Sequence, residues 1–196
     1  MKDQTSTANP PPLADFIDSV EAMRENPNGE SLSHGVARAL KSLLAEPDWL
    51  SQDYRQGWPD RYRQHILHVA PDGGFSVVAL VWQPGQTTPI HDHLTWCVVG
   101  VYEGEEEETL YHLYKDAKGR FFVRAGIETA NPGDVTVLVP PEEDVHQVTN
   151  VGDETAISIH VYGADIGKLG SSINCIFESF RILPEPGDAQ RVPWRR

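Results

Sequence analysis

The chain has 196 residues, of which 39% are hydrophobic and 23% charged, proportions that are ordinary for a globular protein and unlike those of a disordered chain. Its formal net charge of −13 argues against nucleic acid or an anionic membrane as a partner, because both attract basic surfaces. No apolar run reaches the length of about 18 residues that a membrane span requires, and the start MKDQTSTANPPP is too polar for a secretory signal. The two cysteines are far apart in the sequence and do not suggest a disulfide framework. We therefore expect a cytoplasmic protein.

The first quarter of the chain is predicted to be helical. Residues 1–12 end in three prolines, and we expect a flexible N-terminal tail there. Apolar residues then recur at helical spacing and predict a helix over 13–25, which an Asn-Pro-Asn-Gly segment ends. A second helix is predicted from residue 32 to about residue 45, with Pro47 just beyond its end.

From residue 63 the sequence favours β-structure, because short runs of valine, isoleucine and aromatic residues alternate with glycine and proline. Strands are predicted over about 64–69, 75–82, 95–102, 109–114, 120–125, 134–138, 145–149, 155–162 and 173–180. Many short strands favour a closed barrel or jelly roll. We therefore expect a single all-β domain over 13–196, with the helical segment 13–50 packed outside it.

Two acidic clusters interrupt this pattern. The first comprises Glu103 and residues 105–108, and the second comprises residues 142–144. Charged runs of this kind usually form solvated edges or loops that resist aggregation. We interpret both clusters in that way.

Three histidines are candidates for a metal site. His91 and His93 lie two residues apart, and in extended chain their side chains would point to one face. Neutral imidazole is a common ligand for divalent transition metals, and with His146 the set has three ligands, fewer than the four of a closed structural zinc site. The alternative is that His91 and His93 are ordinary histidines, which is the more common case for an isolated His-x-His pair.

A polar stripe is predicted on a later strand. Ser158, His160 and Tyr162 occupy every second position, and the residues between them are isoleucine or valine. The three polar side chains therefore share one face. They form either a polar outer surface or a hydrogen-bonded set beside the metal.

The stretch GQTTPIHDHLTWCVVGVYEG (residues 85–104), taken with His146 and Asn150, resembles the two-part metal signature of the cupin superfamily. The first cupin motif usually contains a glutamate ligand, and here that position holds Cys97. With cysteine in place of this glutamate, the motif resembles that of the cysteine dioxygenase family of thiol dioxygenases. The second motif departs from the usual pattern, because Glu143 stands where a glycine is common.

The resemblance implies an all-β cupin fold (a jelly-roll barrel) and a ferrous iron cofactor, Fe(2+), bound by His91, His93 and His146. It implies an oxidoreductase that adds both atoms of O2 to the sulfur of a small thiol. We expect the thiol and O2 to be its partners and the protein to be a monomer or a small homo-oligomer. A metal-binding sensor without catalytic activity, or a cupin enzyme for another substrate, remains an alternative, because fold does not fix function.

The resemblance also implies roles around the metal. His160 would orient the phenol of Tyr162, with Ser158 completing the set, and Tyr162 would donate a hydrogen bond to the oxygen or the substrate. Cys97 aligns with a cysteine that mammalian-type enzymes join covalently to the tyrosine matching Tyr162. The plainer interpretation of Cys97 is a small buried thiol.

The substrate is left open between cysteine and 3-mercaptopropionate. The phrase TPIHDHLTW is closer to the bacterial branch that oxidises 3-mercaptopropionate, whereas Cys97 resembles the mammalian-type enzyme. Both substrates carry a carboxylate, which requires a cation or hydrogen-bond donors. The candidates to bind it are Gln64, Arg63 and Lys168, of which Lys168 replaces an arginine of the bacterial branch and lacks its bidentate geometry.

Overall fold

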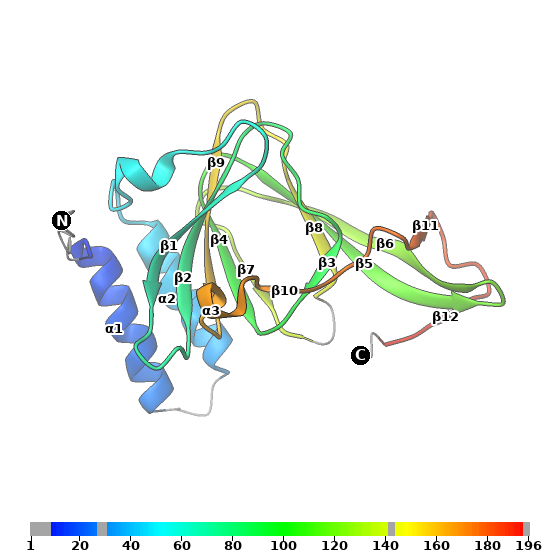
Figure 1. Cartoon of the computed structure of the whole chain (residues 1–196), viewed down its shortest axis with the longest axis horizontal. Coiled ribbons are helices and arrows are strands. Elements are labelled where there is room, and N and C mark those ends of the chain that lie inside the picture. Colours follow the sequence, from blue (N-terminus) through cyan, green and yellow to red (C-terminus); the bar gives the residue numbers. More distant parts are fainter. Residues whose placement is uncertain (1–8, 27–30, 141–143, 194–196) are drawn as a thin grey trace.

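The computed structural model describes residues 9–26, 31–140 and 144–193. Figure 1 shows two helices beside a β-barrel, with a long hairpin extending away from them. The helical elements are α1 (Pro11–Glu25), α2 (Leu32–Leu44), the 3-10 helix η1 (Gln52–Arg55) and α3 (Ile166–Leu169). The strands are β1 (Arg63–Val69), β2 (Ser76–Trp82), β3 (His91–His93), β4 (Cys97–Glu103), β5 (Glu106–Asp116), β6 (Gly119–Ala130), β7 (Val135–Leu138), β8 (His146–Asn150), β9 (Ala156–Tyr162), β10 (Ile173–Ile176), β11 (Arg181–Leu183) and β12 (Gln190–Arg191). None of the helices in these described ranges is long and apolar enough to cross a membrane.

The strands form two sheets whose order differs from their order in the chain. One sheet runs β1-β2-β9-β4-β7 and the other β10-β3-β8-β5-β6-β11, with β12 paired to β5. Strands distant in sequence, such as β2 and β9, are therefore hydrogen-bonded neighbours. This topology confirms the predicted all-β cupin fold, a jelly roll with the N-terminal helices packed outside it (Figure 1).

Strands β2 and β9 of the first sheet are buried on both faces, and β9 separates an apolar layer from a polar one. Ile157, Ile159 and Val161 of β9 belong to one cluster with the buried residues of α1 and α2. Full burial of such a side chain contributes about 1.5–3 kcal/mol to stability. The alternate positions face the barrel interior, where Tyr162 packs in a second cluster with Trp82 of β2.

The acidic cluster at residues 105–108 was predicted to be a solvated edge or loop, and that prediction is wrong for its central part. Strand β5 begins at Glu106, earlier than the predicted residue 109, and Glu106 is only 2% exposed. The side chain of Glu108 is 12% exposed. Alternation along the strand turns both carboxyl groups toward the barrel interior.

Other boundaries differ from the predictions in smaller ways. Helix α1 begins at Pro11, two residues before the predicted start, because proline is tolerated in the first helical turn, where its missing N–H has no partner to lose. Residues 1–8 of the predicted tail lie outside the described residues. Strand β3 was not predicted as a separate strand, since a segment of three residues is too short to show a periodicity.

Gly104 shapes the turn between β4 and β5. Its φ is +79°, a left-handed conformation that favours glycine, and a Cβ at this position would lie 2.6 Å from the Cα of Ala156. The turn therefore requires both the conformational freedom and the small size of glycine.

We predict that Gly104→Ala lowers the free energy of unfolding by about 1–3 kcal/mol, because the added methyl group is both strained and in contact with backbone. Urea denaturation of the variant and the wild type measures the difference. Gly126→Ala is the matched control, since nothing lies within 4 Å of its Cβ position, and it should change stability by less than about 0.5 kcal/mol. Equal stability of the two variants would contradict the role assigned to Gly104.

Candidate metal centre

Three buried histidines converge inside the barrel. His91 on β3 pairs with His146 on β8 in the sheet register, and His93 lies two residues along β3 on the same face. One ring nitrogen from each histidine lies within 4.8 Å of the others. Each of the three residues is at most 5% exposed. This is the spacing at which three imidazoles can share one metal ion, and the structure brings together the three residues predicted from the sequence.

Hydrogen bonds orient two of these rings for metal binding. His91 Nδ1 lies 2.9 Å from the carbonyl oxygen of Pro89 and must donate to it, which leaves Nε2 with its lone pair. His146 Nδ1 bonds the Glu108 carboxylate, and its buried Nε2 has no hydrogen-bond partner among the described residues. A carboxylate on the far nitrogen of a ligand histidine fixes the ring and raises its basicity.

The environment keeps His91 and His93 neutral, which is the form that binds metals. The pKa of His91 is lowered to about 3, mainly by burial and also by the nearby His146. Burial also lowers the pKa of His93 far below its usual range, with the other histidines adding to the effect. Three imidazole ligands, with no carboxylate in the cluster formed by the described residues, suit a divalent transition metal and leave coordination positions open.

Asp144 holds β3 in place behind the histidines. Its carboxylate is fully buried and accepts the backbone N–H of His93 at 3.0 Å. Asp92, between the two histidines of β3, faces the other way and accepts hydrogen bonds from Asn174 and from the backbone of Cys175. The two aspartates therefore position β3 from opposite sides. Glu142 and Glu143, the other members of the second acidic cluster, lie outside the described residues.

The predicted polar stripe forms a hydrogen-bonded chain inside the barrel. Tyr162 Oη lies 3.1 Å from His160 Nδ1, and His160 Nε2 lies 2.9 Å from Ser158 Oγ. Trp82 Nε1 donates to the same Ser158 oxygen at 3.1 Å. Burial lowers the pKa of His160 to about 3, with smaller contributions from His146 and His91, so His160 is neutral and carries one ring proton.

Cys97 lies beside this chain. It is a fully buried free thiol directly opposite Tyr162 in the β4–β9 register. Its Sγ is 3.9 Å from His160 Nδ1. Burial raises the pKa of the Cys97 thiol and that of the Tyr162 phenol well above their usual values, so both groups are protonated at neutral pH.

The three residues predicted to bind a carboxylate lie in different places. In the sheet register Gln64 of β1 lies opposite Leu80, and Leu80 lies opposite Ser158. Gln64 is therefore on the same face of the sheet as Ser158, and it is exposed because β1 is the edge strand. Arg63, one residue earlier, is on the opposite face of β1 because side chains alternate, and its guanidinium lies over the ring of Trp58.

Lys168 is also directed away from the barrel interior. Its side chain is 77% exposed and forms an ion pair with Asp165. Lys168 belongs to the short helix α3, and Asp165 is the residue that caps the start of that helix. The structure therefore brings only Gln64 of the three onto the face that carries Ser158.

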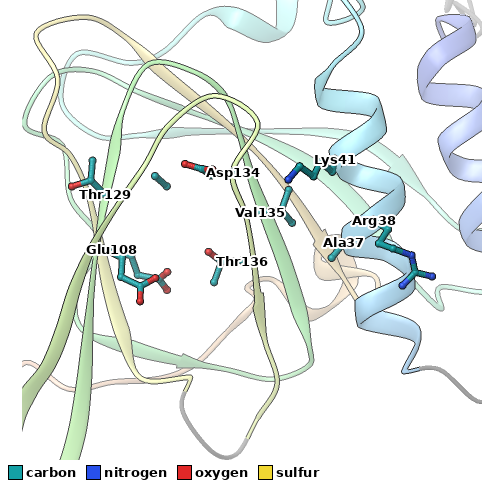
Figure 2. A pocket seen from close by; sticks show the side chains of 10 residues that line it. Ala37, Arg38, Lys41, Glu108, Thr129, Asp134, Val135 and Thr136 are labelled. Atoms are coloured by element: carbon teal, nitrogen blue, oxygen red, sulfur yellow. The ribbon is translucent and has the colours of Figure 1, made fainter.

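Glu108 lies between the histidine cluster and a cavity near the surface, and its side chain is part of the wall of that cavity. Figure 2 shows this cavity between α2, which carries Arg38 and Lys41, and the segment that leads into β7, with Glu108 on the barrel side. Its volume is about 490 Å³. A much smaller interior cavity of about 20 Å³ shares Glu108 as a wall and reaches His146. Glu108 thus separates the imidazole cluster from the outside on this side of the barrel.

Sequence reasoning missed several residues that contact the predicted site: Glu108, Asp144 and Trp82. Glu108 was hidden in a run of glutamates, although Glu106 and Glu108 already show the two-residue spacing that continues into Leu110 of the same strand. Nothing in the sequence alone pairs Trp82 with Ser158, because that contact depends on the β2–β9 pairing.

The fold and the three-histidine cluster define a cupin with a candidate metal site. Sequence comparison then identifies its family: the family model described as Cysteine dioxygenase type I matches residues 37–168. The chain belongs to the cysteine dioxygenase type I family. This family is metal-dependent. Membership of the family supports the conclusion that the protein is an oxygenase that acts on a small molecule with O2.

Individual relatives are distant. Cysteine dioxygenase type 1 of Danio rerio is 24% identical over 164 residues, which cover 82% of this chain and 78% of the relative. The Homo sapiens protein of the same name is 24% identical with the same coverage. Among solved structures, a Cupin 2 conserved barrel domain protein from Salinispora arenicola is 22% identical, with a TM-score of 0.42 over 58% of this chain and 85% of its own.

We predict that Glu108→Gln weakens metal binding by about 10- to 100-fold, because it removes the negative charge from Nδ1 of His146 while keeping the side-chain size. Titration of the metal-free protein with Zn²⁺ measures the affinity. Glu107→Gln on the same strand is the matched control, because its side chain points to the opposite face, and it should bind as the wild type does. Unchanged affinity in the Glu108 variant would remove Glu108 from the metal centre.

Proposed function

We propose that this protein is a thiol dioxygenase with ferrous iron, which converts cysteine or 3-mercaptopropionate and O2 into the corresponding sulfinate. One observation carries the proposal: a buried cluster of three histidines, with no carboxylate ligand among the described residues, lies near the hydrogen-bonded Ser158–His160–Tyr162 chain, and His146 and His91 help to lower the pKa of His160. Membership of the cysteine dioxygenase type I family supports it.

The residues that would hold the iron are His91, His93 and His146. Bound there, iron would supply neighbouring coordination positions for a thiol and O2, and its charge, not offset by a carboxylate ligand, would favour the thiolate. The protein contributes a dry and fixed environment, since the side chains of the cluster are buried and two rings are held by Pro89 and Glu108.

Tyr162 would act as the hydrogen-bond donor to the reacting molecules. The phenol is 2% exposed and stays protonated because burial raises its pKa. His160 fixes its orientation from one side, and Cys97 packs against it from β4. A donor held in a water-excluded site stabilises developing negative charge more strongly than one in water.

Gln64 is the proposed contact for the substrate carboxylate. Its amide N–H groups are on the interior face of β1, in the same row as Leu80 and Ser158. Neutral donors bind a carboxylate less strongly than a bidentate arginine does. We therefore expect weak substrate affinity, with the thiol supplying the main attachment.

The direct test is anaerobic reconstitution with ferrous iron, followed by oxygen consumption with cysteine, 3-mercaptopropionate or cysteamine and mass analysis of the product. We expect one of the two acids to gain two oxygen atoms. His93→Ala should lose both iron and activity, because a ligand is removed, while His34→Ala, an exposed histidine of α2, should retain both. Iron-loaded protein that consumes no oxygen with any of these thiols would instead favour a metal-binding module.

We predict that Tyr162→Phe keeps the iron and slows thiol oxidation by about 10- to 100-fold, the value of one hydrogen bond to a charged group. Iron content and the rate of oxygen consumption measure the two properties separately. Tyr54→Phe, on an exposed tyrosine, is the control and should match the wild type. A full rate in the Tyr162 variant would exclude the phenol from the reaction.

A further inference from the structure

Glu106 is a buried carboxyl group that the metal centre does not explain. It lies on β5 and is 2% exposed, and its Oε1 has no hydrogen-bond partner among the described residues. A buried carboxyl group with incomplete hydrogen bonding is costly. Its neighbour Glu108 is accounted for by the bond to His146, whereas none of the hydrogen bonds among the described residues joins Glu106 to a ring nitrogen of His91, His93 or His146.

Glu106 does reach the end of the polar chain on β9. The hydroxyl of Ser158 is close enough to this carboxyl group to lower its pKa by hydrogen bonding, and Ser158 continues through His160 to Tyr162. The four groups form one line from β5 across the barrel to the phenol. Trp82 donates to the Ser158 oxygen and so occupies one of its two lone pairs.

With Glu106 ionised, the hydrogen bonds of this line can run in one direction. The carboxylate can only accept, so Ser158 donates its O–H to Glu106 and accepts from His160 Nε2. His160 then has no proton on Nδ1, and that nitrogen accepts the O–H of Tyr162. The phenol proton points to His160 and away from the metal ligands.

With Glu106 protonated, every bond reverses. The carboxylic acid donates to Ser158, Ser158 donates to His160 Nε2, and His160 Nδ1–H donates to the oxygen of Tyr162. The phenol proton is then free for another acceptor. Both arrangements satisfy Ser158, because its oxygen accepts from Trp82 and one other donor in each case.

We infer that Glu106 is a positioning residue whose proton determines, through Ser158 and His160, whether the hydroxyl of Tyr162 points to His160 or to the substrate. The inference depends on the proposed function only for its effect on the rate. The hydrogen-bond reversal itself is a property of the barrel interior.

The surroundings of Glu106 allow both protonation states near neutral pH. The pKa of Glu106 is raised to about 7, mainly by burial; the Ser158 hydroxyl opposes the rise and the charge of Glu108 adds to it. Facing the same interior cavity are Glu108 on the same strand, Asp134 before β7 and His146 on β8, and His160 lies beyond Ser158. No lysine or arginine lines this cavity among the described residues, so nothing there holds Glu106 ionised.

The first test observes His160 directly. Protein loaded with Zn²⁺ and labelled with ¹⁵N-histidine is titrated across about pH 5–9 by NMR, which reports the protonated ring nitrogen, and the His160 signals are assigned by their loss in His160→Asn. We expect the proton on Nδ1 at low pH and on Nε2 at high pH, with a midpoint near 7. A His160 tautomer that stays the same across the range overturns the inference without any further variant.

Substitution of Glu106 then links the change to this carboxyl group. Glu106→Gln keeps the shape but cannot titrate, so the pH-dependent change of tautomer should vanish, whereas Glu107→Gln should retain it. A change of tautomer that persists in Glu106→Gln assigns it to another group and overturns the inference.

The rate supplies an independent readout with ferrous iron and the active thiol. Only the protonated form leaves the phenol free, so wild-type turnover should fall about tenfold per pH unit above the pKa of Glu106, and Glu106→Gln should lack this fall. A fall that survives in Glu106→Gln overturns the effect on the rate. If no thiol is oxidised at all, the proposed function fails, while the NMR titration still decides the inference.

Discussion

The burial of strand β9 on both faces is the constraint on which the rest of this structure depends. Its isoleucines and valine bind the sheet to α1 and α2, while the residues between them must project into the barrel. Polar groups placed there have no access to water and must hydrogen-bond one another. The same alternation that attaches the helices therefore creates the Ser158–His160–Tyr162 chain next to the histidine cluster.

The carboxylates Glu108 and Asp144 lie behind the three candidate metal ligands and do not belong to the histidine cluster. Glu108 reaches His146 Nδ1 and Asp144 reaches the backbone of His93, so negative charge orients the ligands without joining them. Cys97 occupies the position where the usual cupin motif has a glutamate ligand, and it faces Tyr162 rather than completing the histidine cluster. The candidate ligands are therefore all imidazoles, and carboxylates hold them in place from behind.

Much of the site could be predicted from the sequence because strand periodicity is local. His91 with His93, and Ser158 with His160 and Tyr162, follow a spacing of two, and the structure turns each set to one face. Arg63 could not be placed, because a shift of one residue in register reverses the face and only the pairing of Gln64 with Leu80 sets it. Glu106 and Glu108 were misread, since charge suggested a solvated loop and burial depends on contacts with distant strands.

The hydrogen bonds that hold His91 and His146 involve only groups of the protein itself, the carbonyl of Pro89 and the carboxylate of Glu108. The rings are therefore arranged by the barrel and do not need an ion to order them. In small zinc domains the unfolded chain collapses around its metal, and chelators unfold it. A metal bound at this candidate site would therefore enter and leave a barrel that is already folded, and its loss would not unfold the chain.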